Sequence, residues 1–356
     1  MMFNRNGKEI MEKEIEYRKK LPLTNVEDLA KNFEFSYDSE ILKGEIFLAR
    51  YGMNRILKKY AGLPYDYNIH ALFEHGIIYT DYVGGAFRIH EYLPSIVASQ
   101  FRIKILEKQK GYKGAYAIGP YIHYANSLLS KEEIKSEKER LGRTLLVFPS
   151  HSIDCAVANF NENTFLTKIK EIGKDFDSVR ICMYNHDVIL KRHIPYLKEG
   201  FEVVTAGQTN DYYFLPRLKS IIQLSDMTMA NDIGTHLGYA IYLDKPHYLI
   251  KQNVSFDVTN KIVEKNEKEA EERENNSSNT HKIINLFSDY EERISKDQYE
   301  LISYLWGFNE VKTPSELKNL IFEINNDYSN MKYYLSCIKR TKDLLFENLS
   351  LRFKSL

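Results

Sequence analysis

The chain has 356 residues, and its 49 lysines and arginines are balanced by 49 aspartates and glutamates, so the formal net charge is zero. A general nucleic-acid-binding protein needs a basic surplus on at least one face, so this balance argues against that class of protein. The 3 cysteines include no CxxC pair, which argues against a disulfide framework and against a zinc ribbon.

The length fits about two domains, and the elements expected along the chain divide in the same way. Residues 1–40 are polar and expected to be helical, and residues 41–60 carry apolar positions at helical spacing. Short apolar runs then predict a strand at 68–77, a helix at 95–110 and a strand at 114–125. This order favours a parallel sheet, so we assign residues 1–140 to an N-terminal Rossmann-like domain with leading helices.

A clearer alternation follows a charged helix or connector expected at 130–143. The expected strands and helices are 144–151, 163–174, 178–185, 188–200, 201–207, 214–225, 227–231, 235–243 and 246–250, beginning and ending with a strand. This rhythm predicts a doubly wound parallel sheet, which we assign to a second domain over residues 141–255. Residues 256–356 are expected to form a charged, solvated insertion at 261–282, disordered near 275–279, and C-terminal helices that pack back on both domains.

Ligands of open α/β sheets bind at the carboxyl ends of the strands, so the residues that follow each expected strand are the site candidates. In the first half these are Glu74 and His75, where an imidazole beside a carboxylate could deprotonate a hydroxyl. A structural loop histidine is the alternative. In the second half the strand ends supply Ser150, His151, Ser152, His186, Gly207 and Gln208. A helix cap is an equal alternative for the group around His186.

The strongest candidate is the segment from Asn231 to His236, where a strand gives way to a helix. Such a junction leaves backbone N–H groups unpaired at the positive end of the helix, and it favours a phosphate or diphosphate. Gly234 and Gly238 would let a ligand approach the backbone, Thr235 offers a hydroxyl, and Asp232 or His236 could contact a sugar. A structural turn is the competing interpretation.

Several common site motifs are missing from the sequence. It has neither GxxxxGK[ST] nor GxGxxG, so a P-loop or a dinucleotide cofactor is not predicted. No HExxH spacing occurs, and the pair Asp175 and Asp177 reads as a turn. We therefore expect no metal ion and no cofactor beyond a substrate.

Three segments together resemble glycosyltransferases of the GT-B architecture, in which two Rossmann-like domains face each other across a cleft. They are FPSHS after the first strand of the second domain, the Gly207 loop, and SDMTMANDIGTHLGYAIYLDKP. The resemblance implies that Asn231, Gly234, Thr235 and His236 contact the phosphates of a nucleotide-sugar donor. It also implies an acceptor-side first domain with His75 as the base, and helices after residue 306 that cross back over the cleft.

The sequence thus predicts a metal-independent transferase that moves a sugar from a nucleotide-activated donor to a hydroxyl of a surface glycan or lipid-linked glycan. A sugar-nucleotide epimerase on the same fold and a non-catalytic glycan-binding protein stay open as alternatives. The charged first 20 residues do not resemble a signal peptide, and no apolar run is long enough to span a bilayer. We expect a cytoplasmic protein. The amphipathic C-terminal stretch predicts a helix packed on the domains, and docking to anionic lipid at the inner membrane face is the alternative.

Overall fold

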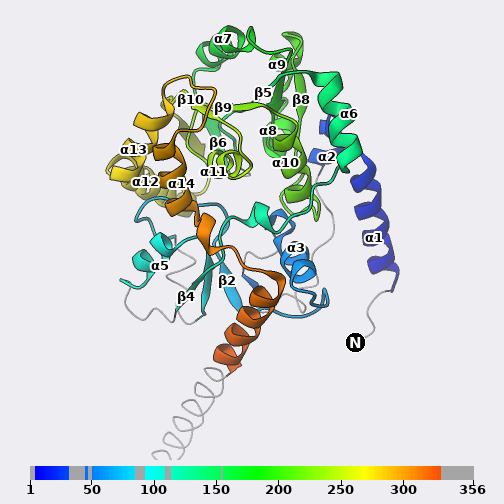
Figure 1. Cartoon of the computed structure of the whole chain (residues 1–356), viewed down its shortest axis with the longest axis vertical. Helices are drawn as coiled ribbons and strands as arrows, with labels where there is room; N and C mark the ends of the chain where they lie inside the picture. Colours follow the sequence, from blue (N-terminus) through cyan, green and yellow to red (C-terminus); the bar gives the residue numbers. More distant parts are fainter. Residues whose placement is uncertain are drawn as a thin grey trace, which may run out of the picture.

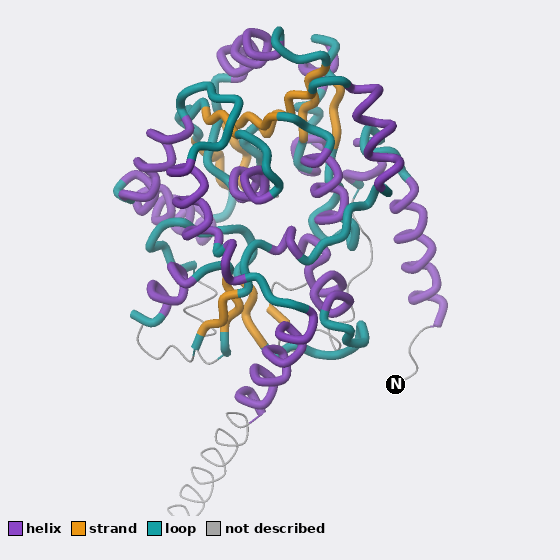
Figure 2. The backbone as a smooth tube through the Cα atoms, viewed as in Figure 1, coloured by secondary structure: helices purple, strands orange, loops and turns teal. Residues whose placement is uncertain are grey.

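The computed structural model describes residues 5–31, 45–46, 50–84, 93–108, 114–153 and 155–329. The described chain forms two halves, each built around a parallel sheet, with a group of helices beside both (Figure 1). The backbone view separates the two clusters of strands clearly (Figure 2). The α/β class expected from the sequence, with two parallel sheets and C-terminal helices, is confirmed.

The N-terminal sheet consists of very short strands that neighbour one another in chain order. They are β1 (Glu45–Ile46), β2 (Ala71–Phe73), β3 (Ser95–Val97) and β4 (Ala115–Ala117), and all are parallel. Helices were expected at 41–60 and 95–110, and this expectation was wrong for the residues that form β1 and β3. Helices follow only later, as α3 (Met53–Tyr60) and α5 (Gln100–Leu106). Ser99 marks the change, because its hydroxyl accepts from the Arg102 amide and caps α5.

The second sheet has the strand order β10-β9-β5-β7-β8, so the chain reverses direction across the sheet between β5 and β9. The strands are β5 (Thr144–Phe148), β7 (Ser178–Cys182), β8 (Glu202–Val204), β9 (Met227–Ala230) and β10 (His247–Leu249). The helices between them are α7 (Glu162–Gly173), α8 (Asn185–Ile189), α9 (Ile194–Lys198), α10 (Phe214–Gln223) and α11 (Thr235–Tyr242). The doubly wound order predicted from the sequence is confirmed.

Two details of this half differ from expectation. The single helix expected at 188–200 is replaced by two short helices, α8 and α9. Lys191 lies between them and adopts a left-handed backbone conformation with φ 59°. A strand pair was also missed, because β6 (Ala156–Asn159) pairs antiparallel with β11 (Ser255–Val258) outside the main sheet. The connection from the first half, α6 (Lys131–Leu141), begins with a capping box between Ser130 and Glu133.

The charged segment at 261–282 is helical, so the expectation of disorder near 275–279 was wrong. It forms α12 (Lys261–Asn275) and the first part of α13 (Ser278–Phe287). The hydroxyl of Ser277 caps α13, and Ile283 and Phe287 are fully buried. Packing on the rest of the protein thus overrides a composition that looks disordered when it is taken alone.

The remaining described helices return to the first half of the chain. After α14 (Lys296–Trp306) and η3 (Phe308–Glu310), residues 314–329 are helical and lie beside the N-terminal sheet (Figure 1). Asn325 donates to the carbonyl of Asn68, and Tyr328 stacks on His70 with ring centroids 4.3 Å apart. The amphipathic stretch that motivated the membrane prediction begins at residue 331 and lies outside the described residues.

The leading helices α1 (Arg5–Lys20) and α2 (Val26–Ala30) pack on the second half, which corrects their assignment to the first domain. A buried ionic cluster holds them there: Asp211 pairs with Arg217 at 2.9 Å, and the Arg217 guanidinium donates to the carbonyl of Arg18. The Gln208 amide also donates to the carbonyl of Leu29 in α2. The domain boundaries near residues 140 and 255 stay predictions.

One hydrophobic core runs through both halves, from Ile96 and Tyr121 to Leu146 and Leu237. At its centre the fully buried Trp306 packs against Gly238, where a Cβ atom would lie only 2.1 Å from the indole nitrogen. Gly238 thus accommodates Trp306, which corrects the expectation that it admits a ligand. Within the described residues, no helix combines the length and apolar character that crossing a bilayer requires.

Candidate functional site

A cavity of about 350 Å³ lies where the carboxyl ends of the two sheets meet. Gly76, after β2, and Tyr121, after β4, line it from the first half. The second half contributes the residues that follow β5 and β9, including Ser150 and Gly234. Between β5 and β9 the strand order reverses, and that point is where open α/β sheets bind their ligands. The topology and the cavity therefore identify the same place.

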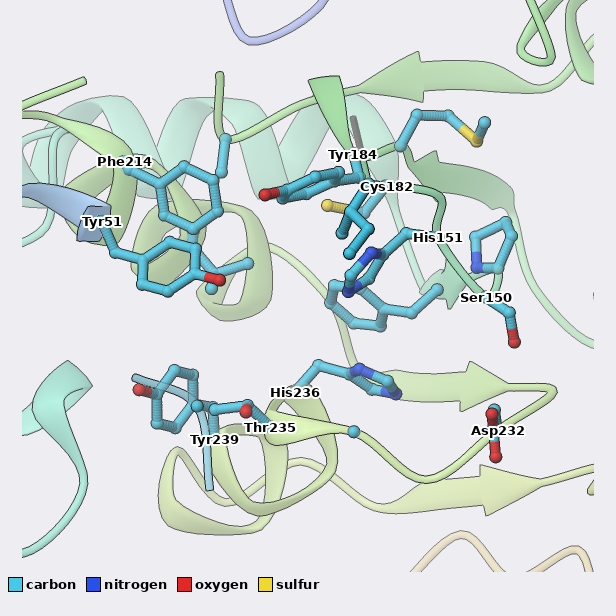
Figure 3. Close-up of a pocket in the computed structure, with 18 of the residues that line it drawn as sticks. Tyr51, Ser150, His151, Cys182, Tyr184, Phe214, Asp232, Thr235, His236 and Tyr239 are labelled. Atoms are coloured by element: carbon cyan, nitrogen blue, oxygen red, sulfur yellow. The ribbon is translucent and has the colours of Figure 1, made fainter. Parts of the chain in front are cut away.

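The cavity has an aromatic side and a polar side. In Figure 3, Tyr51 and Phe214 lie together on one side, and their ring centroids are 4.9 Å apart. Ser150 and Asp232 lie on the opposite side (Figure 3). Among the described residues that line the cavity there is no lysine or arginine. A bound anion would therefore depend on neutral hydrogen-bond donors in the lining rather than on an ion pair.

The beginning of α11 supplies such donors. Gly234 precedes the helix in an extended conformation, with φ −148° and ψ 177°, and no side chain of the described residues caps α11. The carboxylate of Asp232 accepts from the Ile233 amide at 2.8 Å, so that amide is occupied. The amides after it are not covered by a capping side chain. They stand at the positive end of the helix, next to the cavity.

Thr235 joins the two halves at this point. Its hydroxyl oxygen accepts from the Ile77 amide at 3.0 Å, and its carbonyl accepts from the Trp306 indole at 3.3 Å. A hydroxyl that accepts one hydrogen bond can still donate its own proton. Thr235 therefore fixes the start of α11 against the loop that follows β2 and keeps one donor for a ligand.

His236 lies over the glycine that precedes the helix. Its ring stacks on Phe148 with centroids 4.7 Å apart, and a Cβ atom on Gly234 would lie 2.7 Å from the imidazole carbon. Burial, with a smaller contribution from His151, lowers the pKa of His236 to about 3. The imidazole is therefore neutral near pH 7. Its Nε2 has no hydrogen-bond partner in the described structure.

Ser150 and His151 also line the cavity, as the sequence predicts for residues after β5. The Ser150 amide and hydroxyl both donate to the Asn231 side chain, at 2.7 and 3.0 Å. His151 stacks on Tyr184 with ring centroids 4.4 Å apart, and the residue as a whole is exposed. The two residues thus have different roles: Ser150 is held by the protein, whereas His151 forms part of an aromatic wall.

Acidic residues from the loop after β9 and from α12 lie near the polar side. Lys251 binds both Asp232 and Glu274, the latter at 3.2 Å, and thereby links the loop after β9 to α12. Glu267, also on α12, lines the cavity and is half-buried. Burial raises the pKa of the Glu267 carboxyl. Nothing in the charge run of α12 marked Glu267 as a cavity residue.

Three predicted site residues do not line the cavity and are instead engaged in structural contacts. Asn231 is fully buried, and besides Ser150 it binds Gln252 at 3.1 Å. Ser152 is fully buried, and its hydroxyl donates to the Asp187 carboxylate at 2.7 Å. Both oxygens of Glu74 accept from Arg102, with a shortest distance of 2.7 Å. Glu74 therefore cannot assist His75 as expected, because its carboxylate is already bound inside the core.

The other predicted residues do not line the cavity either. Gly207 has φ +96°, and a Cβ atom added to it would lie 3.0 Å from the Arg217 guanidinium. The Gln208 side chain accepts from the Asn210 amide. This loop supports the leading helices. His186 lies in the first turn of α8. No side chain in the described part of the chain caps this helix, so the capping alternative was wrong too. His75 adjoins the lining residue Gly76, and burial together with nearby Arg50 lowers its pKa to about 4.

Sequence reasoning missed most of the aromatic lining. Tyr51, Tyr121, Phe214 and Tyr239 come from η1 (Arg50–Gly52), η2 (Tyr121–His123), α10 and α11, and none follows a strand of the second sheet directly. In a single sequence an aromatic residue on a helix reads as core. Only Tyr184 carried a usable signal, because it stands at the end of β7 beside the residues that were considered.

Among the described residues, no group of three or more histidine, cysteine, aspartate or glutamate side chains is arranged to hold a metal ion. Metal independence stays a prediction from the sequence.

No protein-family model matches this sequence, and no curated protein matches it. Two solved structures are similar. For the structure of the wall teichoic acid polymerase TagF, the TM-score is 0.35 and the identity 12%, over 97% of this chain and 100% of that chain. For the pneumococcal O-GlcNAc transferase GtfA in complex with UDP and GlcNAc, the TM-score is 0.31 and the identity 10%, over 80% of this chain and 54% of that chain. This chain spans about half the length of GtfA.

Proposed function

We propose that this protein is a glycosyltransferase that moves a sugar from a nucleotide-activated donor to a hydroxyl of a glycan or lipid-linked glycan acceptor. The observation that carries the proposal is the start of α11, which no described side chain caps and which faces a cavity at the reversal of the strand order. Unpaired amides at a helix start favour phosphate groups. The aromatic side of the cavity suits the flat rings of a nucleoside.

The same geometry suits the chemistry of transfer. When the bond between the sugar and the phosphate breaks, negative charge develops on the departing phosphate. Amides after Ile233, the Thr235 hydroxyl and a neutral His236 could stabilise that charge without a metal ion in the step. The acceptor hydroxyl must also lose a proton to a base. His75, the base expected from the sequence, adjoins the cavity through Gly76, and its low pKa makes it a weak base.

A thermal-shift screen against UDP, GDP, CMP and dTDP tests this proposal. A nucleotide at a hundred times its dissociation constant stabilises the folded protein by about 2.7 kcal/mol. With an unfolding entropy of about 2.1 cal/mol/K per residue, roughly 0.75 kcal/mol/K for 356 residues, the midpoint Tm should rise by about 3–4 °C. No rise with any of the four nucleotides would count against the proposal.

Two glycine variants locate the binding. Gly234→Ala puts a methyl group into the space of the His236 ring, so it should abolish the nucleotide-induced rise. Gly84→Ala is the matched control, because among the described residues its added Cβ meets only the Tyr82 ring, at 3.8 Å. If a nucleotide stabilises the wild type and Gly234→Ala equally, the phosphate lies elsewhere. Isomerisation of the donor sugar without an acceptor would favour the epimerase alternative.

A further inference from the structure

Helix α12 presents two carboxylates on one face. Glu267 and Glu274 are seven residues apart, which is about two helical turns and brings them to the same side. Glu274 is bound by Lys251 at 3.2 Å. Glu267 lines the cavity together with residues of both sheets. This segment looked like a solvated charge run in the sequence, and it places one carboxylate in the candidate site.

Glu267 differs from the other acidic residues in and around the site. Lys251 binds Asp232, Arg102 binds Glu74, and Arg192 binds Asp187 at 3.0 Å. No hydrogen bond or ion pair joins Glu267 to another described residue, and burial alone accounts for its raised pKa. A half-buried carboxylate without a counter-ion is unfavourable for folding. Such an arrangement is characteristic of groups that act on a substrate.

We propose that Glu267 is the base that accepts the proton of the acceptor hydroxyl, a role that rests on the proposed transferase function. The acceptor O–H bond breaks and its proton passes to the Glu267 carboxylate. The acceptor oxygen forms a bond to the anomeric carbon of the donor sugar. The bond from that carbon to the phosphate oxygen breaks, and its electron pair leaves with the nucleotide at the start of α11. Glu267 then returns the proton to solvent.

Burial changes the usual order of base strength in this cavity. It penalises the charged form of every group, so it raises the pKa of Glu267 and lowers those of the imidazoles. The pKa values of His75 and His236 fall to about 4 and about 3, below the ordinary value of 4.5 from which that of Glu267 rises. The carboxylate is therefore the better proton acceptor of the three, in contrast to the expectation for His75.

The absence of a counter-ion can be tested without any substrate. Glu267→Gln removes a charge that the folded state disfavours, so its Tm should exceed that of the wild type at pH 8, where Glu267 is ionised. The gain should vanish at pH 4, where the carboxyl is largely protonated. Glu264→Gln is the matched control on the same helix, because Glu264 is paired with Lys268 at 2.7 Å on the surface. A Glu267→Gln variant no more stable than wild type at pH 8 would overturn the inference.

Turnover is the second arm of the test. Nucleotide release from UDP-, GDP-, CMP- and dTDP-sugars, with water as the minimal acceptor, should fall at least 100-fold in Glu267→Gln. Its Tm rise with the free nucleotide should equal that of the wild type, and Glu264→Gln should retain full turnover. The fall of kcat/KM toward low pH in the wild type should be missing from the residual activity of Glu267→Gln.

The outcomes separate this inference from the function on which it rests. If the wild type releases nucleotide and Glu267→Gln matches Glu264→Gln, Glu267 is not the base and the transferase proposal stands. If His75→Ala loses turnover instead, the base is His75. If the wild type neither responds to nucleotides nor releases them from any of these donors, the transferase proposal fails and the role of Glu267 fails with it.

Discussion

Substituting Gly238 by alanine should damage the site from inside the core. On helix propensity alone the change should stabilise α11 by about 0.8–1 kcal/mol. However, the added methyl carbon would lie 2.1 and 2.2 Å from two atoms of the Trp306 ring, which is fully buried. Overpacking of this kind costs about 1–3 kcal/mol, occasionally more. A cost at the upper end of this range leaves a net loss of about 2 kcal/mol. With an unfolding entropy of about 0.75 kcal/mol/K for the whole chain, that loss lowers Tm by about 3 °C.

The variant should also lose nucleotide binding, because the Trp306 indole donates to the carbonyl of Thr235 at the start of the same helix. Thermal melts with and without nucleotide measure both effects in one assay. Gly84→Ala controls for the added methyl group, and its Tm should stay within about 1 °C of the wild type. A Gly238→Ala protein with an unchanged or raised Tm and full nucleotide response would refute the packing argument.

Two further predictions concern a buried ion pair and a buried neutral imidazole. Arg102→Met leaves the Glu74 carboxylate buried without a partner, so it should cost about 3–5 kcal/mol and lower Tm by about 4–7 °C; a fall below 1 °C in thermal melts would contradict this. Folding lowers the pKa of His236 from its ordinary value of 6.5 to about 3. As the pH falls below 6.5, the unfolded state therefore takes up this proton before the folded state does. The folded protein loses about 2 kcal/mol of stability in this way by pH 5. His236→Gln should therefore lose less Tm between pH 7 and pH 5 than the wild type, and parallel declines would show that His236 contributes nothing to the acid sensitivity.

The second sheet was predictable because its strands are buried on both faces. Runs such as Thr144–Phe148 and Met227–Ala230 are continuous apolar segments bounded by polar turns, and each is followed by a helical pattern. The N-terminal strands were harder to identify, because they are two or three residues long. Ser95–Val97 runs into the apolar pattern of the helix after it, and only the pairing with β2 and β4 makes it a strand.

The site was predictable only in part, and the reason is also physical. The rule that ligands bind at strand ends identified Ser150, His151 and Thr235, because sheet topology alone places them. It cannot identify Tyr51, Phe214 or Glu267, which reach the cavity only once the two sheets and α12 have packed together. The same rule also selected Asn231 and Ser152, since it does not say whether a polar side chain at a strand end faces a ligand or another loop.

The start of α11 is held from three directions by segments far apart in the chain. The Ile77 amide, from the first half, donates to the Thr235 hydroxyl oxygen, and Trp306, from α14, donates to the carbonyl of the same residue. Phe148, at the end of β5, supports the ring of His236. The amides proposed to bind phosphate therefore point into the cavity only while both sheets and α14 are in contact. It follows that a ligand bound there stabilises the junction of the two halves, and that loosening this junction weakens the binding even where no residue of the cavity is changed.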